Sequence, residues 1–247
     1  DLRASVKRLQ IGSALNLTEL LHISSLLDCA ARAKNYGRQE NEESEGDSLS
    51  PLFSAVEPLT PLNTEIKRCI ISEEEVSDDA SPKLRSIRRQ IRTAGAKIHT
   101  QLNDIVNSNR TQLQDAVITM RDGRYCIPVK AEYKNQVHGM VHDQSQSGST
   151  YFIEPMAVVR LNNEIRELEI AEQKEIEVIL ANLSSQAAPH IDTLRTNLTV
   201  LSQLDYIFAR AALARDMNAS CPQFNEEGYI EIKQGRHPLL KKEQVVP

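Results

Sequence analysis

The chain has 247 residues, no tryptophan and 4% aromatic residues, and its formal net charge is −5 at pH 7. No apolar run approaches the roughly 20 residues that a membrane-spanning helix needs, and no secretory signal is visible, so we expect a cytoplasmic protein. The cysteines form no CxxC pair and have no histidine at ligand spacing, which argues against a disulfide scaffold or a metal site. Such a composition is typical of helices joined through Leu, Ile and Ala.

Charge is distributed unevenly along the chain. Residues 83–134 hold eleven Lys and Arg against four Asp and Glu, a balance of +7, so the remainder carries −12. A basic segment on an acidic protein is one signature of a surface that binds nucleic acid. A helix face solvated by Arg and Lys explains the same balance, and charge alone does not decide between the two.

The N-terminal third of the sequence is typical of helices separated by acidic connectors. Residues 15–36 place apolar side chains at helical spacing, with Asn16 or Thr18 as the N-cap and Gly37 as the end of the helix. Residues 39–50 are acidic and poor in apolar side chains, and we expect a loop there. Two short helices and an acidic connector are expected next, at 52–56, 63–71 and 73–79.

Long helices are predicted on both sides of residues 113–155. Ser81 and Pro82 supply an N-cap and a first-position proline, and apolar residues then recur at spacings of three and four. The returning helix repeats this stripe, with one acidic member, Glu172. The two helices are expected to pair as an antiparallel coiled coil, an arm of about 45 Å. Their expected bounds are 82–111 and 156–187.

The segment between the two helices is predicted to be a β-rich tip. Its runs of Val, Ile and Tyr are interrupted by pairs of turn-forming residues, as in β-hairpins. These pairs are Asp122-Gly123, Lys134-Asn135 and Ser147-Gly148. The predicted fold class is therefore mainly α, with a small β-rich insertion at the end of the arm.

The C-terminal part contains one more predicted helix. Pro189 marks its start, and a wide apolar stripe through residues 191–211 indicates that it packs into the body rather than along the arm. Residues 229–233 alternate like a strand, within a connecting segment at 219–247.

One cluster of residue types resembles a catalytic set. It consists of His138, His142, Asp143, Ser145 and Ser149. A hairpin end offers such residues neither a pocket nor an oxyanion hole, so they are interpreted as polar turn residues and not as a catalytic site. The sequence also contains no GxxxxGK[ST] motif, so it encodes no P-loop for ATP.

Contact with phosphates suits the basic residues better than catalysis does. Four of them lie on or beside the predicted strands, next to Tyr125 and Tyr133: Arg121, Arg124, Lys130 and Lys134. Cations beside aromatic rings can hold phosphates and stack on bases. The tyrosines could instead simply cover the small core of the tip.

A second basic group opens the first long helix. Arg88, Arg89 and Arg92 lie within little more than one turn, so they cannot all face the apolar seam, and at least two must project into solvent. If all seven residues contact phosphates, replacing Arg121 and Arg124 by Glu should weaken binding for every nucleic-acid sequence alike. Thermal stability should hardly change, provided that both side chains are exposed.

The sequence resembles the second bacterial MutS-like family, MutS-two. The segment MRDGRYCIPVKAEYKNQVHGMVHDQSQSGSTYFIEP, residues 120–155, carries the specific part of the likeness, which extends over nearly the whole chain. The LDYIFARA and GRHPLL blocks are shared with MutS mismatch-repair proteins generally. The resemblance implies core and lever helices in residues 1–80, a lever arm and clamp in 81–218, and a strand leading to an ATPase domain in 219–247.

The resemblance also implies a function for the longer parent protein. It would be a homodimeric ATPase that uses ATP and Mg²⁺, usually with a C-terminal Smr nuclease domain. Members of the family are implicated in suppressing recombination by acting on branched DNA, and in rescuing collided ribosomes by splitting their subunits. This chain would grip DNA or ribosomal RNA without binding ATP or a metal itself. The alternative is a coiled-coil scaffold for dimerisation or protein contact, with incidental basic charge.

Overall fold

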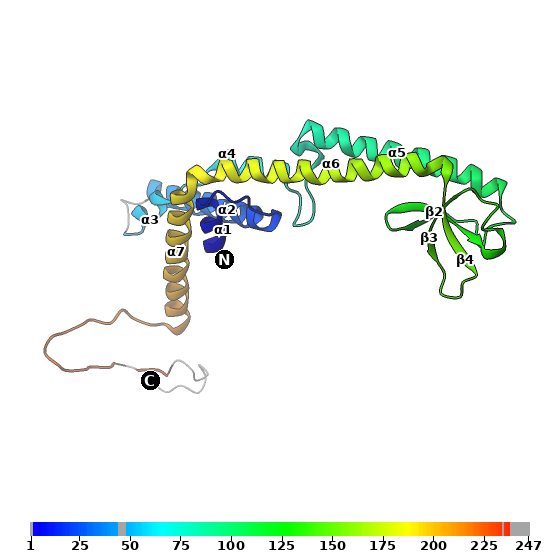
Figure 1. The fold of residues 1–247 in the computed structure, drawn as a ribbon. Coiled ribbons are helices and arrows are strands. Elements are labelled where there is room, and N and C mark those ends of the chain that lie inside the picture. The colour runs from blue at the N-terminus through cyan, green and yellow to red at the C-terminus, as the bar shows by residue number, and fades with distance from the viewer. Residues whose placement is uncertain (1, 44–47, 234, 238–247) are drawn as a thin grey trace. The chain divides into compact units, whose positions relative to one another are not determined.

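The computed structural model describes residues 2–43, 48–233 and 235–237 (Figure 1). Within them the chain divides into two compact units. Unit 1 combines Asp1–Asp28 with Leu59–Asp192, and unit 2 combines Cys29–Pro58 with Thr193–Pro247. Long helices and one small antiparallel sheet confirm the expected class, mainly α with a β-rich insertion.

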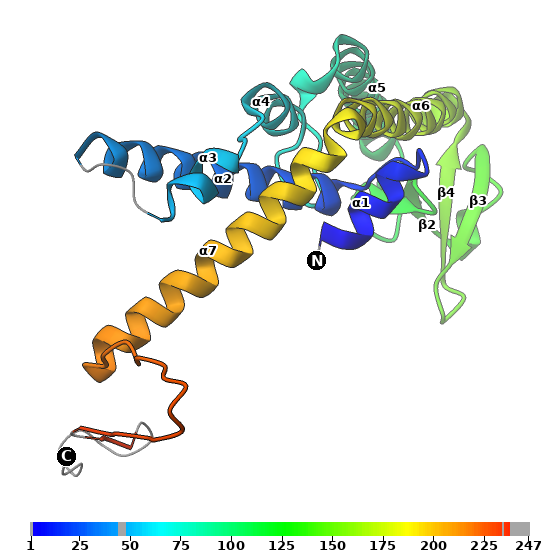
Figure 2. The same ribbon diagram turned by 90° about the vertical axis from the view of Figure 1, so that its left-hand side faces the viewer.

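Unit 1 contains the two paired helices. They are α5 (Pro82–Ser108) and α6 (Met156–Ala187), which lie side by side in Figures 1 and 2. The hydroxyl of Ser81 accepts a hydrogen bond from the Leu84 amide at 2.9 Å, so the predicted N-cap is confirmed. The same hydroxyl donates to Glu175 of α6 at 2.8 Å. The start of α5 therefore lies beside the second half of α6, and the pairing is antiparallel, as expected.

The sheet follows α5 and precedes α6, and all of its strand pairs are antiparallel. Its strands are β1 (Thr119–Arg121), β2 (Arg124–Lys130), β3 (Gly139–Gln144) and β4 (Thr150–Pro155), in the order β1-β2-β4-β3. Asp122 and Gly123 both have positive φ, 48° and 72°, as a tight hairpin turn requires, and Gly148 has φ 73°. Together with the turn at 134–136, these residues confirm all three predicted turns.

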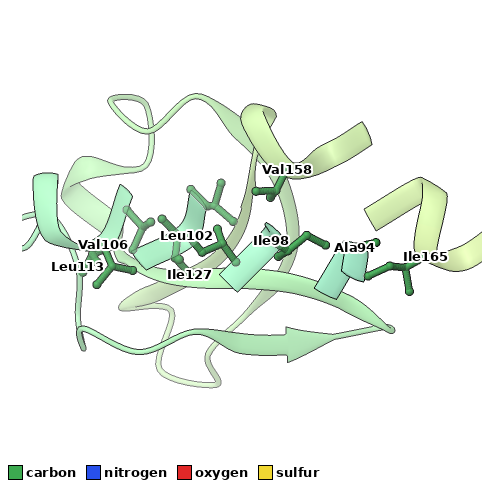
Figure 3. Packing of buried hydrophobic residues seen from close by; sticks show 10 residues of the cluster. Ala94, Ile98, Leu102, Val106, Leu113, Ile127, Val158 and Ile165 are labelled. Carbon is green, nitrogen blue, oxygen red and sulfur yellow. The ribbon is translucent and has the colours of Figure 1, made fainter. Parts of the chain in front are cut away.

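One face of the sheet packs on the end of the paired helices. The shared core joins α5, α6, β2 and β4 through Ala94, Ile98, Leu102, Val106, Leu113, Ile127, Val129, Ile153, Val158 and Ile165 (Figure 3). The phenolic oxygen of Tyr125 lies over Gly95, 3.9 Å from where a Cβ would stand. A continuous apolar core of this kind fixes the sheet to the helix pair.

The remaining elements of unit 1 lie around α6. They are α1 (Leu2–Gln10), the first part of α2 (Leu17–Glu43) and α4 (Thr60–Cys69). A connector with an isolated bridge between Ile70 and Val76 and a 3₁₀ turn at Asp78–Ala80 leads into α5.

Unit 2 contains the rest of α2, α3 (Ser50–Ala55) and most of α7 (Ile191–Met217). A 3₁₀ turn at Ala188–His190 precedes α7, which confirms a new helix near Pro189. Its first half packs into a core with α2 and α3, as the wide stripe predicted. That core consists of Ala30, Phe53, Val56, Val200 and Leu204.

The predicted end of α2 at Gly37 is wrong, because the helix continues to Glu43. A Cβ on Gly37 would stand 2.4 Å from the Cβ of Phe53 in α3. The glycine is therefore needed for close packing and not for a left-handed helix end. The loop expected at 39–50 is correspondingly shorter, and its residues 44–47 lie outside the described part of the chain.

The strand predicted at 229–233 is also wrong, since these described residues form neither helix nor strand. Side chains there are exposed, with Ile230 90% and Ile232 76% accessible. A strand exists only when a neighbour pairs with its backbone, and no described residue does so here. The alternating sequence pattern does not show whether another strand lies beside this segment.

Candidate nucleic-acid interface

The structure divides the seven predicted basic residues into three groups. Arg121 and Arg124 lie at the β1–β2 turn, Lys130 and Lys134 lie at the other end of β2, and the remaining three open α5. Sixteen residues separate Arg92 from the end of α5, about 24 Å of helix. The seven residues therefore do not form a single site.

Arg124 is held inside the tip. Its guanidinium donates to both carboxylate oxygens of Glu154, at 2.9 and 3.0 Å, and to Asn163 at 2.7 Å. Glu154 is fully buried, and it also contacts His142 at 2.6 Å and accepts from Asn162 at 2.7 Å. A buried carboxylate needs such partners, because leaving it unpaired is costly. The condition set for unchanged thermal stability is therefore not met at Arg124, because its side chain is 28% exposed and neutralises a buried charge.

Asn162 connects this network to α6. Its side-chain oxygen accepts from the Tyr125 amide at 3.2 Å, and its nitrogen donates to the Tyr125 carbonyl at 3.3 Å. The sheet is thus fastened to α6 by polar contacts as well as by the apolar core. Neither Glu154 nor Asn162 was identified as important from the sequence. The available signal was that each is a polar residue among apolar ones, Glu154 in its strand and Asn162 on one face of its helix.

Arg121 is only partly free. Its Nε lies 3.1 Å from a carboxylate oxygen of Asp143, and its guanidinium lies 3.9 Å from the centre of the Phe152 ring. With 37% of its side chain exposed, Arg121 can still reach an external anion. Such a contact would compete with the ion pair and the cation–π contact.

Lys130 and Lys134 lie at the hairpin end of the sheet. Lys130 pairs in register with Thr150, and the following amide, of Ala131, donates to the Ser149 carbonyl at 2.9 Å. The Lys134 ammonium lies 4.2 Å from the centre of the Tyr151 ring and is exposed. Figure 2 shows the β3–β4 hairpin extending away from α6. The half-buried Lys130 donates its ammonium to the Thr111 carbonyl at 3.1 Å, so Lys134 is the freer of the two cations at this end of the sheet.

The projecting loop itself is rich in hydroxyl groups. The Ser147 hydroxyl lies 2.8 Å from that of Ser149 and 3.3 Å from that of Ser145. Hydroxyls and ammonium groups are common partners of phosphate oxygens. This end of the tip can therefore bind a sugar-phosphate backbone without reading its bases.

The histidines and the acidic residue of the suspected catalytic cluster serve the sheet. His142 contacts Glu154, Asp143 pairs with Arg121, and the His138 carbonyl accepts from the Met156 amide at 3.1 Å. These residues are interpreted from the sequence as polar turn residues, but His142 and Asp143 lie on β3 rather than in a turn. Burial and the charge of Glu154 raise the pKa of the Cys126 thiol to about 11, so it stays protonated.

At the start of α5, Arg88 is held by three groups. It donates to Glu172 of α6, to the Val76 carbonyl and to Asp78, each at 2.7 Å. Glu172 is the acidic member of the apolar stripe, and Arg88 is the reason that it is tolerated there. The hydrogen bond from Arg88 lowers the pKa of Asp78, and hydrogen bonds from Lys83 and Ser81 lower the pKa of Glu175.

Arg89 and Arg92 are the exposed members of this group, so the prediction that at least two arginines face solvent is confirmed. Arg92 pairs with Asp78 at 3.5 Å while 64% of its side chain stays exposed. Within the described residues, no ion pair involves Arg89.

None of the helices in the described part of the chain is both long enough and apolar enough to span a membrane. Within the same residues, no group of three or more His, Cys, Asp or Glu side chains is arranged to hold a metal ion.

Comparison with known proteins identifies the family. No family model matches the chain. Along its whole length, however, it is 56% identical to "Endonuclease MutS2" of Lachnoclostridium phytofermentans, over 254 residues and 32% of that protein. It is 57% identical to "Endonuclease MutS2" of Agathobacter rectalis over 249 residues, and 43% identical to that of Halalkalibacterium halodurans over 251 residues. The alignments cover 31% and 32% of these two relatives.

The chain thus spans about a third of the length of the curated relatives that it matches. The sequence identity is above 40% in alignments that cover the whole chain, which similar amino-acid composition alone does not produce. The specific block at 120–155 forms the sheet and its turns. The chain belongs to the MutS2 family, as one segment of the longer family proteins.

Proposed function

We propose that this chain is the lever and clamp region of a MutS2 protein, and that it grips nucleic acid through the hairpin end of its sheet. The observation that carries the proposal is the position of Lys130 and Lys134 beside the hydroxyl-rich loop 145–149. An exposed lysine, a second half-buried one and exposed hydroxyls at a projecting end fit a sugar-phosphate backbone. The relatives are named endonucleases, and endonucleases act on nucleic acid.

The helix pair would act as the lever. α6 has 32 residues, so it is about 48 Å long. A rotation of about 0.1 radian at one end would move the other by about 5 Å. The apolar core and the Glu154 network would pass that movement on to the hairpin with little bending.

Other activities belong to the proposal for the whole protein. They are binding of ATP and Mg²⁺, nuclease chemistry, homodimer formation, and action on branched DNA or on the ribosomal RNA of collided ribosomes. This chain contains no GxxxxGK[ST] sequence, and we assign none of its residues to ATP. Its own residues would bind and orient the nucleic acid.

Photo-crosslinking in cells tests the proposal and distinguishes the targets. The full-length protein would carry a benzophenone amino acid in place of Ser147, in the hairpin loop, or in place of the 79% exposed Ile11 as a control. We expect DNA or ribosomal RNA to be captured from position 147 and not from position 11. Capture of protein alone, or equal capture at both positions, would refute the nucleic-acid contact.

A further inference from the structure

Four arginines from two helices converge on the 3₁₀ turn Asp78–Ala80. Arg68 of α4 donates to the carbonyls of Asp79 and Ala80. From α5, Arg85 pairs with the Asp79 carboxylate, and Arg88 and Arg92 pair with Asp78. This short acidic turn therefore occupies most of the positive charge at the start of the arm.

The α5 arginines differ in how firmly they are held. Arg88 is 17% exposed and has partners on the turn and on α6, as a structural residue has. Arg85 and Arg92 are 60% and 64% exposed, and each has a single carboxylate partner. Exposed pairs of this kind contribute little to stability, so an external anion can exchange with them.

The exposed arginines share one face of α5. Arg85, Arg89 and Arg92 are four and three residues apart, which places them above one another on a helix. A shallow groove beside Arg89 is lined by Gln90, Thr93 and Lys97, which supply an amide, a hydroxyl and an ammonium group, and on its α6 side by the carboxylate of Glu164. This stripe is chemically suited to successive phosphates.

We infer that this α5 stripe is a second contact surface for a nucleic-acid backbone, and that Asp78 and Asp79 mask it by occupying two of its cations. The inference rests on the proposed function, since it concerns the same ligand. A phosphate and a carboxylate bind a guanidinium in the same forked geometry, so phosphates can take the place of the two aspartates. Binding of nucleic acid then requires the ion pairs with the turn to break, and this cost lowers the affinity of the α5 stripe for phosphates.

Removing the two negative charges tests the mask. The variant Asp78→Asn/Asp79→Asn keeps a side-chain oxygen as an acceptor at each position. Its matched control, Glu73→Gln/Glu74→Gln, changes the net charge equally in the same connector. Glu73 and Glu74 are exposed and, within the described residues, have no arginine partner. The probe is a fluorescently labelled four-way DNA junction, titrated by anisotropy at several salt concentrations.

We expect the aspartate variant to bind the junction about tenfold more tightly at low salt, with a salt slope steeper by up to about 1.8, because two arginine–phosphate contacts are no longer offset by two freed carboxylates. Adding Arg85→Ala and Arg92→Ala to that variant should abolish the gain. An equal gain in the glutamine control, or a gain that survives loss of both arginines, would overturn the inference.

Failure of the inference can be told apart from failure of the proposed function. If the unmodified chain binds neither the junction nor a ribosomal RNA helix, the proposed function is wrong. If it binds and the aspartate variant matches its control, only the masked surface is wrong. A thermal melt of each variant shows whether the protein remains folded. If the aspartate substitutions also weaken the packing of α4, the variant that adds Arg85→Ala and Arg92→Ala still shows whether the gain in affinity depends on the two arginines.

Discussion

The sheet and the start of α5 both hold arginines against acidic residues, but the burial of the acidic partners differs. In the sheet, Arg124 closes on Glu154, which is fully buried. At the start of α5, Arg92 closes on Asp78, which is 40% exposed. The arginines differ as well, since the side chain of Arg124 is 28% exposed and that of Arg92 is 64% exposed. Burial of the arginine and of its partner together therefore decides whether an arginine is structural or available for an external anion.

The comparison is sharpest if Arg124 is truncated. Arg124→Ala leaves the carboxylate of Glu154 buried without its main counter-charge, and we expect a loss of about 3–5 kcal/mol in the free energy of unfolding. Urea denaturation followed by circular dichroism measures it. Glu154→Gln should cost less, because no buried charge is left. A loss below 1 kcal/mol for Arg124→Ala would break the distinction between the two regions.

The corresponding change at Arg88 should have a smaller effect. Arg88→Ala removes three hydrogen bonds, yet its acidic partners Glu172 and Asp78 are 25% and 40% exposed and can be rehydrated. We expect a loss of about 1–3 kcal/mol in the same denaturation experiment. Arg89→Ala, on the same helix, is the control and should stay within about 0.5 kcal/mol.

Acid should weaken the start of α5. The pKa values of Asp78 and Glu175 are lowered, by Arg88 and by Lys83 with Ser81 respectively. A lowered pKa contributes stability above the ordinary value, and this is lost as pH falls through the folded value, here below about pH 4.5. Urea titrations between pH 7 and pH 3 should show stability falling in that window. Asp78→Asn and Glu175→Gln should each flatten the fall, and an unchanged profile would contradict the assignment.

The smallest expected effect lies where α5 meets the sheet. A Cβ at Gly95 would make an ordinary contact with Tyr125, so Gly95→Ala should stabilise the protein by about 0.5–1 kcal/mol. At Gly37 the same change meets Phe53 at 2.4 Å and should destabilise. The melting temperatures of the two variants should therefore shift in opposite directions. A rise in both would show that helix propensity outweighs packing at Gly37.

Local chemistry explains what the sequence could predict. The paired helices follow from apolar spacing and the Ser81 cap, and the β1–β2 turn follows from Asp122 and Gly123. Both signals act within a few residues. The fold class and the three turns were accessible for that reason.

Contacts between distant residues explain the rest. The partner of Arg124 lies thirty residues away on another strand, so basic charge alone could not show that this arginine is structural. Gly37 looked like a helix end because its partner Phe53 belongs to another helix. The sequence could predict which cations belong to the candidate site. It could not show which of them form ion pairs inside the protein and which are exposed.

The central claim is that the two lysines of the hairpin end grip nucleic acid, and charge reversal tests it most directly. Lys130→Glu/Lys134→Glu is compared with Lys7→Glu/Lys174→Glu, which alters two exposed lysines of the same unit and changes the net charge equally. The salt dependence of binding to a four-way DNA junction and to a ribosomal RNA helix is measured for both. We predict a slope lower by about 1.8 for the duplex junction in the hairpin variant alone. The free energy of unfolding should fall by only about 1 kcal/mol, through loss of the hydrogen bond from Lys130 to the Thr111 carbonyl. Equal losses in the two variants, or no loss in either, would contradict the account.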